Sequence, residues 1–258
     1  MAGIRPRLVW QHATVRELIE ETPHAKSLIL DVPGWPGHRA GQHLDVRLTA
    51  ADGYQTERSY SIASAPTDPQ VMLTVERLED GEVSPYLTDV LRPGDQLELR
   101  GPIGGWFTWR PEEGGPLLLV AGGSGIAPLM AMIRYRAAVQ SPVPVCLLYS
   151  SRTYEEIIYR EELDWLATAG ADLDVVHTIT RSQPAGWQGY RRRIDRAMLE
   201  EVAWTPMERP LIFVCGSNPL VEAVATACVE LGHPPERVKT ERFGPIGEAS
   251  GEAGGGAV

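Results

Sequence analysis

Hydrophobic and polar residues alternate in short runs over the first part of the chain. The runs are separated by turn-forming pairs such as Pro33-Gly34, Asp52-Gly53 and Pro93-Gly94. Alternation over four to eight residues, bounded by such turns, is typical of half-buried antiparallel strands. One short helix is expected over 84–91, with Ser84 as its N-cap. The spacing predicts a small β-barrel. Its six strands are predicted at 8–15, 27–32, 43–48, 56–63, 71–78 and 96–100.

The pattern changes at residues 111–116, where Pro, Glu and Gly predict a linker. Beyond it, continuous apolar runs alternate with amphipathic segments, which predicts a parallel sheet covered on both faces. The strands are predicted at 117–121, 145–149, 173–178, 211–215 and 238–240, and the helices at 126–139, 155–168, 195–203 and 219–231. The predicted fold class is therefore an antiparallel six-stranded β-barrel over 1–112, followed by a five-stranded parallel doubly wound α/β domain over 116–245. The Gly- and Ala-rich end, 246–258, is predicted to be a flexible tail.

Composition narrows the function classes. The net charge of −10 over 258 residues argues against general nucleic-acid binding, which needs a basic face. The three cysteines (Cys146, Cys215 and Cys228) form no CxxC pair and are too few for an iron–sulfur cluster, so any such cluster belongs to a partner. His38 and His43 are interpreted as a solvated pair, and no metal site is expected. No apolar run approaches the ~20 residues of a membrane span, and the N-terminus has no apolar signal core. The expected location is the cytoplasm.

A glycine turn joins the first predicted parallel strand to its helix. It reads Gly122-Gly123-Ser124-Gly125-Ile126-Ala127-Pro128. Glycines let a pyrophosphate approach the backbone, the helix N-terminus supplies free amides, and Pro128 suits the first helical turn. The sequence departs from GxGxxG, so this is not the ordinary Rossmann fingerprint. Taken alone, the turn leaves a ligand-free strand-to-helix connection open.

Arginines follow the next parallel strands. The second strand ends in Ser150-Ser151-Arg152, where a Rossmann site would carry an acidic residue for a ribose hydroxyl. A guanidinium there favours an added phosphate. Arg181, and Arg192 or Arg193, are expected to converge on the same sheet edge. Two such contacts would favour NADP over NAD, whereas solvated surface arginines are the alternative.

A second signature, Arg58-Ser59-Tyr60-Ser61, ends a barrel strand. Alternation places Arg58 and Tyr60 on one face, where they suit a phosphate and a flat ring, and Ser61 on the other. An ordinary barrel strand is the alternative. The segment Gly81-Glu82-Val83-Ser84 opens the short helix and offers amides to another pyrophosphate. Two phosphate-site signatures in this order suggest two facing nucleotide cofactors and electron transfer between them.

Taken together, these motifs resemble the ferredoxin–NADP reductase superfamily in its bacterial-type form, over about residues 7–245. The segment Cys215-Gly216 matches the family's nicotinamide segment, and Glu241-Arg242-Phe243 resembles its acidic residue followed by an aromatic. The resemblance implies that Arg58 pairs with the FAD pyrophosphate, Tyr60 stacks on the isoalloxazine and Ser61 lies by its reactive nitrogen.

The resemblance further implies that Ser61, Cys215 and Glu241 surround the point where nicotinamide meets flavin, with Phe243 covering the other flavin face. These three are the expected catalytic residues. The cofactor-binding residues, from motifs and resemblance together, are Arg58, Ser59, Tyr60, Ser61, Ile62, Gly81, Val83, Ser84, Phe243, Gly122, Gly123, Ser124, Gly125, Pro128, Ser151, Arg152, Arg181, Arg193, Cys215 and Gly216.

The expected function is an FAD-dependent oxidoreductase that passes electrons from NADPH to a separate one-electron acceptor protein. Ferredoxin, flavodoxin or an oxygenase component would serve as that partner. An NAD(P)H-dependent reductase of small acceptors, and an electron-transfer subunit of a larger complex, remain alternatives. FAD against FMN, the strength of any preference over NADH, the acceptor and the oligomeric state stay open.

Overall fold

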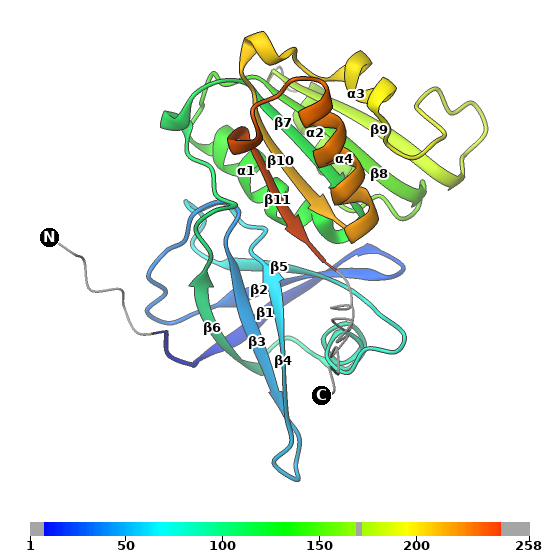
Figure 1. The fold of residues 1–258 in the computed structure, drawn as a ribbon. Helices are drawn as coiled ribbons and strands as arrows, with labels where there is room; N and C mark the ends of the chain where they lie inside the picture. Colours follow the sequence, from blue (N-terminus) through cyan, green and yellow to red (C-terminus); the bar gives the residue numbers. More distant parts are fainter. Residues whose placement is uncertain (1–7, 169–171, 244–258) are drawn as a thin grey trace, which may run out of the picture.

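Two β-sheets divide the chain between them, one below and one above in Figure 1. The computed structural model describes residues 8–168 and 172–243. The antiparallel sheet has the order β4-β3-β6-β1-β2-β5 and the parallel sheet the order β11-β10-β7-β8-β9. The first contains β1 (Gln11–Thr22), β2 (Ala25–Asp31), β3 (His43–Thr49), β4 (Gln55–Ser61), β5 (Val71–Glu76) and β6 (Gln96–Ile103). The second contains β7 (Leu117–Gly122), β8 (Val145–Thr153), β9 (Leu173–Ser182), β10 (Leu211–Gly216) and β11 (Val238–Arg242). The predicted fold class is confirmed.

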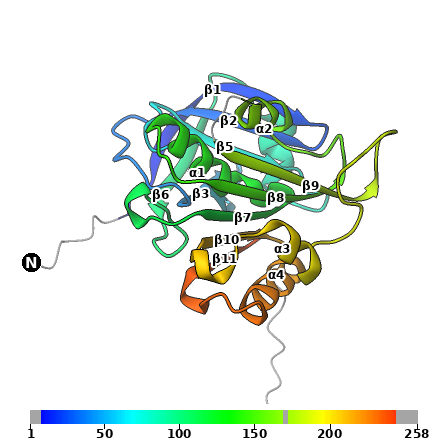
Figure 2. The ribbon, with the colours of Figure 1, turned by 90° about the horizontal axis from the view of Figure 1, so that it is seen from above.

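Helices cover both faces of the parallel sheet, as its uninterrupted apolar strands require. In Figure 2, α1 (Ile126–Ala138) and α2 (Arg160–Thr168) lie on one face, and α3 (Arg196–Val202) and α4 (Asn218–Glu230) lie on the other. The side chains of the central strand β7 pack alternately into the cores on the two faces of the sheet. Leu117 and Leu119 belong to the core under α1, whereas Leu118 and Val120 belong to the core under α4. The barrel has its own core, built from alternate strand residues such as Leu28, Leu44 and Leu99.

Three local predictions are wrong. Strand β1 spans Gln11–Thr22 instead of 8–15, and two register shifts let its longer run pair with β2. Helix α2 begins at Arg160 instead of 155, because Ile157 and Ile158 turn into the core and Tyr159 has a left-handed φ of 59°. Ser84 caps no helix: its hydroxyl accepts a hydrogen bond from the Leu78 amide at 3.0 Å, and the following turn is a π-helix, Tyr86–Val90. The tail predicted over 246–258 lies outside the described residues.

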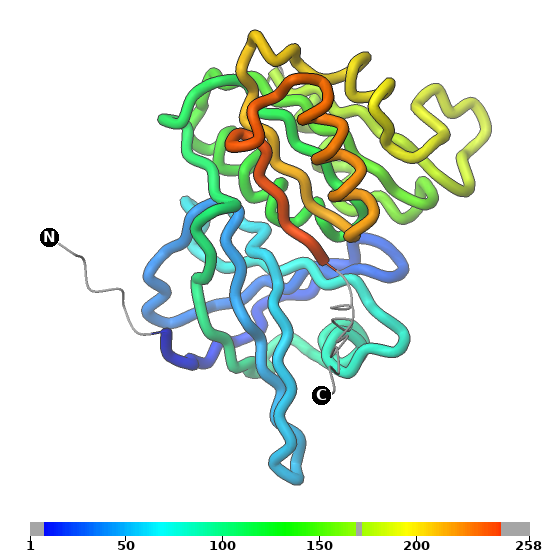
Figure 3. Tube along the Cα trace, viewed as in Figure 1, coloured from blue at the N-terminus to red at the C-terminus, as the bar shows by residue number. Residues whose placement is uncertain are grey.

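Several polar contacts join the parallel domain to the barrel side, and two of them lie close to the connecting segment and to α1. Figure 3 shows the chain leaving the barrel through a single connecting segment before β7. On that segment, the carbonyl of Thr108 accepts a hydrogen bond from Lys239 of β11 at 3.0 Å. The second tie is Arg134 of α1, which donates to the carbonyl of Ala63 at 2.7 Å and forms a two-pronged ion pair with Glu162 at 2.6 and 2.8 Å. The strand ends that face each other are thereby held in contact.

Candidate active site

The ends of β3, β4, β10 and β11 meet where the two sheets face each other. Cys215 on β10 has Glu241 on β11 as its parallel neighbour. In the barrel, Ser61 on β4 lies opposite His43 on β3. His43 bridges the sheets, because its Nδ1 lies 3.7 Å from Oε1 of Glu241. The three predicted catalytic residues are thus linked through His43, which pairs with Ser61 and lies against Glu241, the strand neighbour of Cys215. Figure 1 shows the end of β11 meeting the barrel.

Two polar atoms in this place have no partner. Ser61 Oγ and Glu241 Oε2 are buried, and neither forms a hydrogen bond with any residue that the structure describes. A buried polar group without a partner costs about 1–3 kcal/mol. Their arrangement fits a bound group with a polar edge, one atom contacting it from each sheet.

Burial sets the protonation of the site. It raises the pKa of Glu241 to about 7 and lowers the pKa of His43, opposed there by Asp45. Both groups are thus pushed toward their neutral forms, and at 3.7 Å their contact is a carboxyl against an imidazole rather than a strong ion pair. Burial, followed by the charge of Glu241, raises the pKa of Cys215. Cys215 is therefore a thiol at neutral pH, and thiolate chemistry is not its role.

The glycine turn packs directly on this place. Residues Gly123–Gly125 form a 3-10 turn that leads into α1, and Gly123 has a φ of 54°. A Cβ atom on Gly125 would lie 2.3 Å from the carbonyl oxygen of Cys215, so no larger residue fits there without movement. A Cβ atom on Gly216 would lie 3.3 Å from the Cα and N atoms of Gly122, which is also a tight contact. The turn and the end of β10 therefore present bare backbone to a ligand, and Pro128 is buried in the first turn of the helix.

The predicted phosphate arginines lie on exposed strand ends. Since Ser151 is opposite Ile179 and Thr153 is opposite Ser182, Arg152 and Arg181 are close neighbours on β8 and β9. A hydrogen bond from Thr178 to the Arg192 carbonyl brings the 192–193 segment beside β9.

The arginine side chains differ in their partners. Those of Arg152, Arg181 and Arg193 are exposed and have no hydrogen bond or ion pair within the described parts of the chain. Arg192 instead pairs with Asp195, the N-cap of α3, at 2.9 Å. The first three are thus available to an anion.

The residues of the predicted flavin-binding segments differ in burial and in their hydrogen-bond partners. Tyr60 packs on the barrel core, and burial raises the pKa of its phenol to about 12, so it is a neutral ring. Arg58 is exposed, and its guanidinium donates hydrogen bonds only to neighbouring residues of its own strand, including the Glu57 carbonyl at 2.7 Å. The hydroxyl of Ser59 donates to Asp45 at 2.7 Å, and that of Ser84 holds the Leu78 amide. The Ser84 hydroxyl therefore keeps its O–H donor for a ligand, and the Ser59 hydroxyl keeps acceptor capacity.

The other predicted residues support these surfaces. Ile62 and Val83 are buried in the barrel core, and Gly81 lies tight against Ser84. The Phe243 amide donates to the Gly216 carbonyl at 2.9 Å, and its ring packs half-buried against the parallel domain. Phe243 is thereby held at the same edge as the glycine turn.

Two family models match the chain, one on each sheet. The oxidoreductase FAD-binding domain matches residues 23–108, and the oxidoreductase NAD-binding domain matches residues 119–226. Ferredoxin–NADP reductase B of Sorangium cellulosum is 35% identical over 235 residues, which cover 89% of this chain and 91% of that protein. The chain belongs to the ferredoxin–NADP reductase family. The barrel is its FAD-binding domain and the parallel domain its NAD-binding domain.

Two further comparisons bear on the assignment. The glycine betaine monooxygenase reductase subunit of Pseudomonas aeruginosa is 34% identical over 210 residues, which cover 80% of this chain but 56% of that subunit. The chain thus spans little more than half of that relative. A crystal structure of a ferredoxin–NADP+ reductase from Neisseria gonorrhoeae with bound FAD and NADP has a TM-score of 0.78 at 21% identity, covering 90% of this chain and 98% of that one. It supports the fold.

The interpretation of two histidines as a solvated pair is wrong. His38 bonds the Ser64 carbonyl at 3.1 Å, and His43 faces Glu241. Neither belongs to a recognisable motif, and only the packing of β3 on β11 brings His43 to the site. Glu76, at the end of β5, was missed for the same reason: it reaches the glycine turn from the other domain. As a charged residue inside the predicted strand 71–78, at the end of an otherwise largely buried run, it was the one signal in the sequence.

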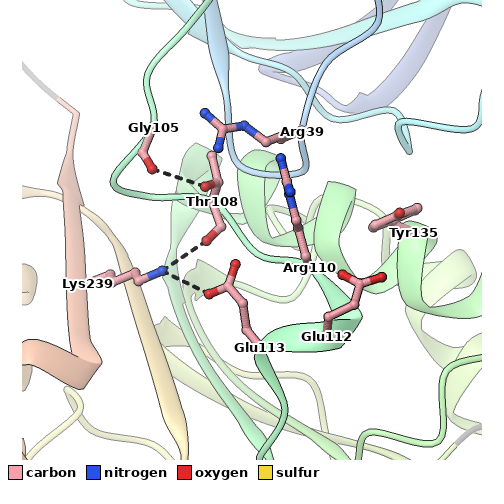
Figure 4. A pocket seen from close by; sticks show the side chains of 8 residues that line it. All are labelled: Arg39, Gly105, Thr108, Arg110, Glu112, Glu113, Tyr135 and Lys239. Carbon is pink, nitrogen blue, oxygen red and sulfur yellow. Dashed lines mark hydrogen bonds and ion pairs between the residues drawn. The ribbon is translucent and has the colours of Figure 1, made fainter. Parts of the chain in front are cut away.

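An open hollow of about 770 Å³ lies beside the connecting segment, away from these residues. Figure 4 shows Arg39, Arg110 and Glu112 among its lining side chains, while Lys239 is already bonded to Thr108 and Glu113. None of the predicted cofactor residues lines it. We therefore assign this hollow to the connecting segment between the domains and not to a cofactor.

Within 8–168 and 172–243, no group of three or more His, Cys, Asp or Glu is arranged to hold a metal ion. In the same part of the chain, no helix is long and apolar enough to cross a membrane.

Proposed function

We propose that the protein is a cytoplasmic FAD-dependent oxidoreductase that takes electrons from NADPH and passes them to a separate one-electron acceptor protein. The observation that carries this proposal is the pair of unpartnered buried atoms, Ser61 Oγ and Glu241 Oε2, where the FAD-binding and NAD-binding domains meet. We assign residues 1–112 and 116–245 to the two domains, on either side of the linker.

When bound, FAD supplies the ability to accept two electrons together and release them singly. The chain holds the reactants close, because effective concentration lowers the barrier. Arg58 offers a cation to the pyrophosphate and Tyr60 an apolar ring face to the flavin. Ser61 offers its hydroxyl to the ring edge. Glu241, whose pKa is raised to about 7 by burial, carries a proton in much of the population at neutral pH and donates a hydrogen bond there.

On the NAD-binding side, the bare backbone of Gly122–Gly125 and Gly216 receives the pyrophosphate and the nicotinamide beside Cys215. Arg152, Arg181 and Arg193 are available for the extra phosphate of NADPH. The relatives support a protein acceptor: one is named for ferredoxin and NADP, and the other is a reductase subunit of a monooxygenase. Ferredoxin, flavodoxin or an oxygenase component is therefore the expected partner class.

The test is anaerobic stopped-flow absorbance of the FAD-loaded protein, mixed separately with NADPH and NADH. Rapid bleaching of the flavin band by NADPH and slower bleaching by NADH are expected. Equal rates would refute the arginine assignment and keep the reductase. No bleaching by either would refute the catalytic proposal.

An acceptor panel separates the remaining alternatives. Turnover with ferredoxin or flavodoxin well above turnover with free flavin, quinone or ferric complexes is expected. Turnover confined to the small acceptors would favour a small-acceptor reductase. Turnover that appears only when a co-purifying protein is added back would favour a subunit of a larger complex.

A further inference from the structure

A carboxylate from the barrel sits on the dinucleotide loop of the other domain. Glu76 ends β5, and its Oε2 accepts a hydrogen bond from the Ser124 amide at 3.3 Å. A Cβ atom placed on Gly123 would lie 3.4 Å from the same oxygen. The carboxylate therefore lies against the first turn that leads into α1.

No cation accompanies this carboxylate. In the described part of the chain, Ser124 is its sole hydrogen-bond donor, and no Arg, Lys or His nitrogen lies within 4.0 Å. Other carboxylates at the interface differ: Glu162 pairs with Arg134 and Glu113 with Lys239. The charge of Glu76 is met by the Ser124 amide, close to a helix N-terminus, where the partial positive charge favours an anion.

The loop itself is held in place. The hydroxyl of Tyr149 donates to the Gly123 carbonyl at 3.1 Å and accepts from the Ile158 amide at 3.3 Å. Gly125 is closed in by the backbone of Cys215 and Gly216. The loop is therefore fixed by several contacts, whereas the half-buried Glu76 side chain has one hydrogen bond, of 3.3 Å, among the described residues.

We propose that the Glu76 carboxylate is an internal competitor for the coenzyme pyrophosphate: it occupies the anion position on the loop until the coenzyme displaces it. The proposal rests on the proposed function in one respect, that the pyrophosphate binds at Gly122–Gly125. Two anions repel each other over one set of amides, so the resident carboxylate weakens coenzyme binding. The same carboxylate returns as oxidised coenzyme leaves, which speeds product release.

Calorimetric titration of the FAD-loaded protein tests this, with NADP+ and NAD+ as ligands. Glu76→Gln keeps the shape and removes the charge, Glu76→Ala also removes the side chain, and Glu17→Gln removes an exposed charge elsewhere on the barrel. Both Glu76 variants are expected to bind the coenzyme about tenfold more tightly. Glu17→Gln should match the parent protein. Adenosine 2′,5′-bisphosphate, which lacks the pyrophosphate bridge, should bind all four proteins equally.

The possible results distinguish failure of the Glu76 role from failure of the proposed function. Unchanged or weaker coenzyme binding in both Glu76 variants would overturn the competitor role and leave the reductase standing. Tightening in Glu76→Gln alone would also overturn it, because the new amide would then be making a contact of its own. An equal gain for adenosine 2′,5′-bisphosphate would do the same. No coenzyme binding to any of the proteins would overturn the proposed function together with the role of Glu76.

Discussion

Replacement of Glu241 by glutamine should change how the stability of the protein depends on pH. Burial raises the pKa of this carboxyl from its usual 4.5 to about 7. The folded protein therefore holds the proton more tightly than the unfolded chain does. Stability that is fully present below pH 4.5 is lost as the pH rises toward 7, and little further change is due to Glu241 above that pH. Glutamine has no proton to lose, so the variant escapes this loss.

The size of the effect follows from the two pKa values. Each unit of difference in pKa corresponds to about 1.4 kcal/mol, so the ionised carboxyl costs about 3 kcal/mol above pH 7. The side chain is only 21% exposed, so solvent screening removes little of this. Relative to wild type, Glu241→Gln should gain about 3 kcal/mol between pH 4.5 and pH 8. Burial keeps Cys215 a thiol in both proteins over this range, so it adds nothing to the difference.

The assay is urea denaturation of flavin-free protein at several pH values, with no cofactor to change the surroundings of the carboxyl. Glu236→Gln, at an exposed position before β11, is the matched control and should follow wild type. A constant difference between Glu241→Gln and wild type from pH 4.5 to 8 would refute the reasoning. It would mean that water or a neighbouring group stabilises the ionised carboxyl.

Three further predictions concern the interface and the coenzyme. Arg134→Met should lower the free energy of unfolding by about 2 kcal/mol, because the Ala63 carbonyl loses its donor and the partly exposed Glu162 loses its ion-pair partner; a loss below about 1 kcal/mol in urea denaturation would contradict this. Gly125→Ala should cost about 2 kcal/mol, since its Cβ meets the Cys215 backbone at 2.3 Å, and should weaken NADP+ in calorimetry; unchanged affinity would remove the turn from the coenzyme site. Arg152→Ala should weaken NADPH about tenfold more than NADH in steady-state kinetics, and equal losses would exclude it from the phosphate site.

The order of elements could be predicted because it depends on local pattern. Alternation marked the barrel strands, and unbroken apolar runs such as 117–121 and 211–215 marked buried parallel strands. The ends of helices and strands were predicted less accurately where contacts between distant residues decide them. Residues 155–159 have helical composition, yet Ile157 and Ile158 gain more by entering the core than by extending α2.

The residues of the site also divide into those that the sequence could predict and those that depend on contacts between distant segments. Ser61, Cys215 and Glu241 were expected together from family resemblance; the structure places them at neighbouring strand ends, and their roles stay predictions. His43 and Glu76 could not be found in this way, because each acts on a residue of the other domain. Their roles depend on how two sheets are docked, and no spacing along one chain segment records that docking.

The two ties between the domains also limit how the molecule can move. Lys239 is bound to the segment that leaves the barrel, and Arg134 is bound to the Ala63 carbonyl within it. Further contacts join the same two domains, since Glu76 accepts from the Ser124 amide and His43 lies against Glu241. The domains are therefore held at several separate points, and any opening of the interface must break more than one of these contacts. Coenzyme entry is expected to rearrange side chains at the interface instead of swinging the parallel domain away from the barrel.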